Sequence, residues 1–319
     1  MAATLGACPR RPAVIHRTDS TRQGNHGPNR VTGDFHIGDF HGGDLAAPAA
    51  AASLIDHLTA IASQAAAAIQ RVAPAAAARR MKADRSPVTE ADEAAEALIL
   101  DALARLMPGV PVVSEEAAGR GAHPPLGDCF ILVDPLDGTR EFLDGRDDFT
   151  VNIAVVTDGV PAVGIVAAPA HGRIWRGATG RGGERLDLAP GAAPAAARNV
   201  TPLRPRRRPP GGLVATVSRS HLDPRTAAFV AGLPQAGQMV CGSSLKFCRL
   251  AEGSADVYPR LAPTREWDIA AGHAVLAASG GTVTAPDGSP LAYGRTAEDF
   301  RVPGFVAWAD PIAAAALRE

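Results

Sequence analysis

The sequence FILVDPLDGTREF, residues 130–142, is the most informative part of the chain. Its apolar run predicts a buried strand ending at Asp134, so this carboxylate is expected at the carboxyl edge of a sheet, where α/β proteins bind ligands. Asp137 follows three residues later, and a helical turn would bring the two carboxylates together. Gly138 lets the backbone approach a ligand closely, and Thr139 adds a hydroxyl near a predicted helix N-terminus, which suits a phosphate group.

Two carboxylates at this range repel each other unless a positive charge lies between them. Mg²⁺ is the cation that the pattern favours, because it takes oxygen ligands and is commonly held by a few carboxylates together with substrate phosphate. The alternative is a pair of Asp-Pro and Asp-Gly turns whose carboxylates only cap backbone amides. These residues alone leave both interpretations open.

Three further carboxylates stand at the ends of predicted elements. Glu115, in the motif SEE, follows the apolar run VPVV and is expected at a second strand end. Asp92, in SPVTEAD, follows Thr89 by three residues at the start of a predicted helix, where it can complete a capping box. Asp268, in WDIAAGH, is predicted to be a helix N-cap. Each has a purely structural alternative, which is a solvated loop for Glu115 and capping for the other two.

The surrounding sequence predicts a mixture of helices and strands. Helices are expected from Ser53 and from Thr89, the second ended by Pro108-Gly109. The apolar, β-branched segments VPVVS, CFILVD, FTVNIAVVTD and AVGIVAAP predict strands. Residues 189–212 are rich in Pro, Ala and Arg and are interpreted as a linker or exposed loop, with Arg206 to Arg208 solvated. Beyond them LVATVSRS and ADVYPR predict strands, and SLKFCRLAEG and WDIAAGHAVLAASGG predict helices.

Composition excludes several classes of protein. The 319 residues carry a formal net charge of −1, which argues against binding nucleic acid by bulk charge, and aromatic residues make up 4%. The four cysteines are far apart and suggest neither a zinc site nor a disulfide framework. No apolar run is long enough to span a membrane, and the start lacks a secretory signal. We therefore expect a cytoplasmic protein, with a peripheral position at the inner face of the membrane as the alternative.

The first residues differ from the rest of the chain. Residues 1–52 lack sustained periodicity, and we interpret them as a flexible N-terminal extension. His36, Asp39, His41 and Asp44 could be imagined as metal ligands, but we favour their assignment to this extension.

Taken together, the motifs resemble one family. The D-P-L-D-G-T core, the preceding S-E-E and the distant W-D-x-A-A-G-H, in this order from about Ser53 to the C-terminus, are similar to the lithium-sensitive, magnesium-dependent phosphatases of the inositol monophosphatase superfamily. SPVTEAD, FTVNIAVV, SRSH, GSSLKFC and ADVYPR resemble the CysQ-type 3′(2′),5′-bisphosphate nucleotidases within it. Residues 1–52 and 189–212 have no counterpart in this resemblance.

The resemblance implies roles for individual residues. The magnesium ligands, for two or three ions, would be Glu115, Asp134, Asp137, Asp268 and the main-chain carbonyl of Leu136. Asp92 and Thr139, with Glu115, would activate or orient the attacking water. Substrate contacts would come from Gly138, Thr139, His221, Ser243, Lys246, Arg260 and Asp268. Arg140 stands where the family often has lysine, and we assign it no role.

The resemblance also implies a fold and an activity. The expected fold is a mixed α/β, layered αβαβα sandwich of the inositol monophosphatase and sugar phosphatase type. Its expected parts are an N-terminal sub-domain, 53–195, with most metal ligands and a C-terminal sub-domain, 196–319, with Asp268 and the nucleotide contacts.

The expected activity converts adenosine 3′,5′-bisphosphate (PAP) to AMP and phosphate in nucleotide recycling during sulfur assimilation, with the sulfated nucleotide PAPS as a further candidate substrate. The alternatives are an inositol or sugar phosphate monophosphatase and a non-catalytic nucleotide or metal sensor. A small-molecule nucleotide is the expected partner, with neither nucleic acid nor membrane insertion, and the oligomeric state stays open.

Overall fold

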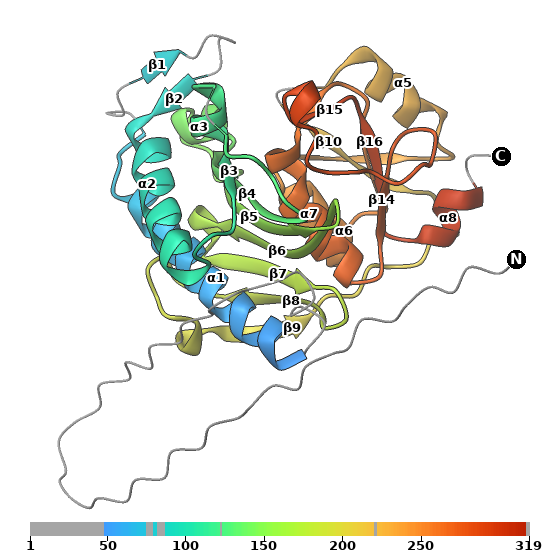
Figure 1. Cartoon of the computed structure of the whole chain (residues 1–319). Helices are drawn as coiled ribbons and strands as arrows, with labels where there is room; N and C mark the ends of the chain where they lie inside the picture. Colours follow the sequence, from blue (N-terminus) through green and yellow to red (C-terminus); the bar gives the residue numbers. More distant parts are fainter. Residues whose placement is uncertain (1–47, 75–78, 82–86, 122, 220–221, 317–319) are drawn as a thin grey trace, which may run out of the picture. The chain divides into compact units, whose positions relative to one another are not determined.

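Two β-sheets and the helices around them form the described part of the protein, which is a computed structural model (Figure 1). The structure describes residues 48–74, 79–81, 87–121, 123–219 and 222–316. These residues all belong to one compact unit. No helix among them is long and apolar enough to cross a lipid bilayer.

The first sheet has seven strands that are neighbours in chain order. They are β3 (Val112–Ser114), β4 (Cys129–Asp137), β5 (Thr150–Thr157), β6 (Val160–Ala168), β7 (Arg173–Ala178), β8 (Gly182–Asp187) and β9 (Arg198–Pro202). Only the β3–β4 pair is parallel, and the remaining pairs are antiparallel.

The second sheet has five strands in the order β11-β10-β12-β16-β14. They are β10 (Val214–Ser218), β11 (Gly237–Cys241), β12 (Val257–Arg260), β14 (Thr282–Thr284) and β16 (Phe305–Trp308). The strands β10, β11 and β12 are parallel, so their carboxyl ends lie at one edge. Two short ribbons complete the strands, β1 (Arg79–Met81) with β2 (Pro87–Thr89) and β13 (Thr264–Arg265) with β15 (Arg301–Val302).

Helices cover both sheets and separate them. Helices α1 (Pro48–Gln70) and α2 (Glu90–Leu106) pack on one face of the first sheet, and α6 (Leu245–Ala251) and α7 (Glu266–Ala278) lie between the sheets (Figure 1). Helices α5 (Pro224–Gly232) and α8 (Pro311–Ala316) lie beyond the second sheet. Three buried apolar clusters fill the spaces between these layers. The predicted αβαβα layering is therefore confirmed.

Helix α7 approaches the first sheet unusually closely because glycines face it. Gly164, Gly177 and Gly183 are cross-strand partners on β6, β7 and β8 and form one row. A Cβ atom on Gly164 would lie 2.3 Å from the main-chain oxygen of Ala271 and 2.8 Å from Cβ of Ala274. The row therefore forms a groove that fits the small side chains of α7, and it fixes the distance between this helix and the sheet.

The structure corrects several predicted element boundaries. The first helix begins at Pro48 rather than Ser53, and the predicted linker 189–212 contains strand β9, which pairs with β8. All five residues of β9 are exposed, so the strand has no alternation of buried and exposed side chains that a sequence pattern could reveal. The first sheet thus ends at Pro202, while the division into sub-domains at residue 195 stays a prediction. His36, Asp39, His41 and Asp44 lie outside the described residues.

Candidate active site

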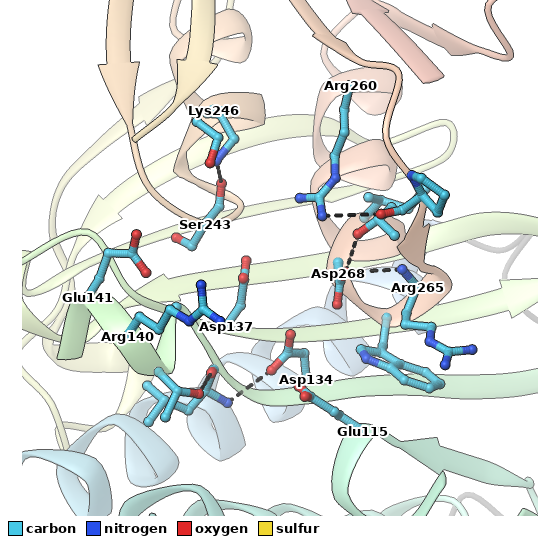
Figure 2. Close-up of a pocket in the computed structure, with 18 of the residues that line it drawn as sticks. Glu115, Asp134, Asp137, Arg140, Glu141, Ser243, Lys246, Arg260, Arg265 and Asp268 are labelled. Carbon is cyan, nitrogen blue, oxygen red and sulfur yellow. Dashed lines mark hydrogen bonds between the residues drawn. The ribbon is translucent and has the colours of Figure 1, made fainter. Parts of the chain in front are cut away.

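A cavity of about 390 Å³ lies where strand ends of the two sheets meet the start of α7 (Figure 2). It includes the carboxyl ends of β4, β10 and β12. Its lining contains ten of the predicted site residues, namely Glu115, Asp134, Leu136, Asp137, Gly138, Thr139, Ser243, Lys246, Arg260 and Asp268. His221 lies outside the described residues, and Asp92 is buried next to the cavity rather than in its lining.

Glu115 and Asp134 are neighbours because β3 and β4 are parallel. Ser114 pairs with Val133, so the next residue along each strand reaches the same edge of the sheet. Ser114 caps the short helix α3 (Glu115–Gly119), and the buried carboxylate of Glu96 accepts a hydrogen bond from the Ala117 amide (3.1 Å). The carboxylate of Glu96, on α2, therefore holds the backbone segment that carries Glu115.

A β-bulge brings Asp134 and Asp137 to the same cavity. Asp134 pairs with Asn152 and Asp137 pairs with Thr150, so β4 has one residue more than β5 between these pairs. On a regular strand, side chains three residues apart would point to opposite faces, and the extra residue reverses this. The convergence does not come from a helical turn, because residues 134–137 are strand and helix α4 (Thr139–Leu143) begins after Gly138.

Asp268 comes to the cavity from the second half of the chain. It is the third residue of α7 rather than the predicted N-cap, which is Arg265. Its Oδ2 atom accepts a hydrogen bond from the Arg265 amide (3.0 Å) and another from the Thr264 hydroxyl. Figure 2 shows Asp268, Asp134 and Glu115 gathered on one side of the cavity, with Asp137 beside them.

Burial and neighbouring charges affect the protonation of the cavity carboxylates. Burial, together with the charge of Asp268, raises the pKa of Asp137 to about 6, although Lys246, the Ser244 amide and Arg260 act in the opposite direction. A cation between the carboxylates would remove this repulsion. The carboxylate and carbonyl oxygens are the donor types that Mg²⁺ takes.

Among the residues that the structure describes, no three His, Cys, Asp or Glu side chains are close enough to enclose an ion by themselves. Mg²⁺ rarely needs such an enclosure, because it is usually held by one or two carboxylates together with water and substrate phosphate. The residues present therefore fit a magnesium site that the substrate completes.

Thr139 and Asp92 form a hydrogen-bonded pair at the edge of the cavity. The Thr139 hydroxyl donates to Oδ1 of Asp92 (3.0 Å), and the main-chain oxygen of Leu136 is a second acceptor within reach (3.2 Å). The other oxygen of Asp92 accepts from the amide (2.8 Å) and the hydroxyl (2.6 Å) of Thr89, which is the predicted capping box. Asp92 is 1% exposed, so its orientation is fixed and the Thr139 hydroxyl is the part of the pair that the cavity reaches.

Ser243, Lys246 and Arg260 line the opposite, basic wall. The buried Lys246 ammonium donates to the main-chain oxygens of Ser243 (2.7 Å) and Cys241 (3.3 Å). Ser243 has a φ of 43°, and its Oγ atom is buried without a hydrogen-bond partner among the described residues, as is Nε of Arg260. Lys246 thus holds the turn that presents Ser243, and two polar groups of this wall are left to pair with a ligand.

Sequence reasoning missed several residues around the cavity. Glu141, Arg265 and Trp267 line it, as does Arg140, to which the sequence assigned no role, and Arg265 lies over the Trp267 ring. Asn152 is buried beneath Asp137. An amide inside the apolar run FTVNIAVV is a signal that could have identified it, because a buried amide needs partners.

Comparisons with known proteins agree with this geometry. The model of the inositol monophosphatase family matches residues 51–315. The 3′(2′),5′-bisphosphate nucleotidase CysQ of Escherichia coli (strain K12) is 42% identical over 224 residues, covering 70% of this chain and 86% of the relative. The CysQ of Buchnera aphidicola is 33% identical over 220 residues, covering 66% and 76%.

Solved structures show the same relationship. The crystal structure of CysQ from Bacteroides thetaiotaomicron, a bacterial member of the inositol monophosphatase family, superposes with a TM-score of 0.66 at 33% identity, covering 80% of this chain and 97% of that one. An inositol monophosphatase from Anabaena superposes with a TM-score of 0.63 at 26% identity, covering 82% and 92%. The fold and the recognition made from the sequence motifs are confirmed, and the chain belongs to the inositol monophosphatase family.

Proposed function

We propose that this protein is a magnesium-dependent 3′(2′),5′-bisphosphate nucleotidase that hydrolyses the 3′-phosphate of PAP to give AMP and phosphate. The observation that carries the proposal is one cavity that gathers both carboxylates and cationic side chains, the latter including Lys246 and Arg260. A substrate with two phosphates needs both, one to hold metal at the reacting phosphate and one to pair with the remaining anion. The similarity to CysQ proteins named for this activity supports the choice.

In the proposed site, Glu115, Asp134, Asp137, Asp268 and the carbonyl of Leu136 hold two or three Mg²⁺ ions, in line with the metal dependence of the family. When bound, magnesium supplies positive charge to the phosphate oxygens and lowers the pKa of a water molecule. Gly138 and Thr139 contact the reacting phosphate. Ser243, Lys246, Arg260 and His221 contact the rest of the nucleotide, and PAPS is a second candidate substrate of the same site.

The Thr139–Asp92 pair would orient the water and receive its proton. Because the Thr139 hydroxyl donates to Asp92, its lone pairs point away from that carboxylate and can accept from a water in the cavity. The water oxygen forms the new bond to phosphorus as the bond to the ribose 3′-oxygen breaks. That oxygen leaves as a hydroxyl after taking up a proton from a solvent water, while the attacking water passes its proton to the Thr139 hydroxyl, which passes its own to Asp92. Positioning and charge dominate such a reaction, so no covalent phosphoenzyme is required.

A substrate panel tests the proposal. Initial rates of phosphate release would be measured on PAP, PAPS and inositol 1-phosphate, with and without Mg²⁺ and with added Li⁺. We expect PAP to be the fastest substrate, activity to require Mg²⁺, and Li⁺ to inhibit. A markedly faster reaction with inositol 1-phosphate contradicts the substrate assignment, and tight nucleotide binding without phosphate release supports a sensor instead.

The substitution Asp134→Asn tests the acidic wall in the same assay. Removal of one charged donor typically costs about 3–4 kcal/mol of transition-state stabilisation, which corresponds to a loss of roughly 10²–10³-fold in rate. The amide keeps the shape of the carboxylate, so folding measured by circular dichroism should be unchanged. Near-wild-type phosphate release by this variant at saturating Mg²⁺ would rule out the metal assignment of Asp134.

A further inference from the structure

Two buried residues outside the cavity lining connect the strand that carries Asp137 to the helix that carries Asp268. Asn152 on β5 and Ser244 at the N-cap of α6 are each 1% exposed. Together they link Asp137 on β4 to the first turn of α7, which carries Asp268. We refer to the pair as the Asn152–Ser244 bridge.

The bridge begins at the Asp137 carboxylate. Oδ2 of Asp137 accepts hydrogen bonds from the main-chain amide of Ser244 (2.7 Å) and from the side-chain amide of Asn152 (3.3 Å). Both donors therefore act on one oxygen of this carboxylate. The two donors fix the direction in which Asp137 presents its other oxygen to the cavity.

The bridge ends on the backbone of α7. The Asn152 amide also donates to Oγ of Ser244 (2.9 Å), and that hydroxyl donates onward to the main-chain oxygen of Asp268 (2.8 Å). Behind it, the Thr150 hydroxyl donates to Oδ1 of Asn152 (3.1 Å). Both hydrogens of the Asn152 amide are thus used, and the Thr150 hydroxyl also lies within reach of Oδ2 of Asp137 (3.5 Å).

We infer that Asn152 and Ser244 are positioning residues that hold Asp137 and Asp268 at the separation required for shared metal binding. This inference rests on the proposed magnesium site. The two carboxylates come from different layers, Asp137 from a strand of the first sheet and Asp268 from α7, and the bridge is bonded to both segments. Hydrogen-bonded partners of metal ligands typically contribute 10–100-fold to metal affinity or activity.

The experiment is a titration of Mg²⁺ at a fixed, saturating concentration of inorganic phosphate, followed by thermal unfolding, on wild type, Asn152→Ala, Ser244→Ala and the double variant. We expect each single substitution to raise the Mg²⁺ concentration for half-maximal stabilisation about tenfold. Because both residues act through one bridge, the double variant should show less than the product of the two effects. In phosphate-release assays, the Mg²⁺ requirement should rise while the rate at saturating Mg²⁺ stays near wild type.

The matched control is Ser63→Ala. Ser63 on α1 is also buried, and its hydroxyl also donates to a main-chain oxygen at 2.8 Å, that of Ala192, outside the cavity. It should lower stability without changing the Mg²⁺ midpoint. Unchanged midpoints in both bridge variants, multiplied effects in the double variant, or an equal shift in Ser63→Ala would each overturn the bridge. A wild type that Mg²⁺ does not stabilise would instead refute the proposed metal site, and the bridge with it.

Discussion

A single inserted residue in β4 determines the geometry of the acidic wall. The bulge between Asp134 and Asp137 brings both carboxylates to one side, which their spacing on a regular strand would prevent. Pro135 lies inside the bulge, where its missing amide hydrogen costs no ladder hydrogen bond. The convergence of the carboxylates was predictable from the sequence, whereas the bulge that produces it was not.

The Thr139 hydroxyl offers a test at the level of one functional group. Thr139→Val keeps the shape of the side chain and removes the hydroxyl that donates to Asp92. We expect kcat on PAP to fall by about 10²-fold or more, because a positioned proton-transfer group typically contributes that much. The Mg²⁺ requirement should change little, since the carboxylates are intact.

Thr139→Ser is the conservative partner of that variant. It retains the hydroxyl and should restore most of the rate in the same steady-state assay. Equal activity of the valine and serine variants would show that the hydroxyl takes no part in the reaction.

Most of the site residues could be predicted from the sequence because they stand in short motifs. Carboxylates at predicted strand and helix ends pointed to a shared edge, and the structure brings Glu115, Asp134, Asp137 and Asp268 into one cavity. The hydrogen-bond partners of Lys246 could not be predicted from the sequence. Its ammonium binds two carbonyl oxygens of a turn whose φ at Ser243 is positive, and such tertiary pairing leaves no local pattern.

Helix α7 packs closely against the first sheet. It is buried along most of its length, lies between the sheets and carries Asp268 in its first turn. The glycine row on β6, β7 and β8 sets its height above the first sheet. Displacement of this helix would therefore alter the cavity without any change to a cavity residue.

Gly164→Ala tests that packing. The new methyl group would overlap the Ala271 carbonyl oxygen, so we expect a loss of about 1–3 kcal/mol in the free energy of unfolding. Shifting α7 should also lower phosphate release. Urea denaturation and steady-state assays measure the two effects.

Gly232→Ala is the control for this substitution. Gly232 ends α5, and a Cβ there would have no atom within 4 Å, so stability should change by less than about 1 kcal/mol. If the two alanine variants were equally stable, the close approach of α7 would not limit stability.

The elements differ in how well their sequences predict them. Strands β4, β5 and β6 have continuous buried apolar runs, and the predictions there are confirmed. Strands β7 and β8 were not predicted, because arginine, glutamate and glycine interrupt their patterns. Their neighbours in the sheet stabilise them, which is information that a local window of sequence does not contain.

At the scale of the whole molecule, a buried histidine makes stability depend on pH. Burial lowers the pKa of His273 to about 4, against about 6.5 in an unfolded chain. Between these values only the unfolded chain binds the proton. Above about pH 6.5 this histidine therefore does not reduce the free energy of unfolding. As the pH falls toward 4, that free energy decreases by up to about 3 kcal/mol.

Urea unfolding at a series of pH values measures this effect. His273→Gln, which can keep a polar contact with Tyr293, should lose less stability than wild type over that interval. His57→Gln, on an exposed position of α1, is the control. Identical pH profiles for wild type and His273→Gln would show that His273 is not responsible for the acid sensitivity.

The cavity combines residues of the first sheet with residues of β12 and α7, and this has a consequence for protein synthesis. A ribosome completes the whole first sheet before it adds β12 and α7, because chains are made from the N-terminus. A chain that ends before β12 lacks both Arg260 and Asp268, although it already contains Glu115, Asp134 and Asp137. The cavity is therefore complete only in chains that extend past the start of α7.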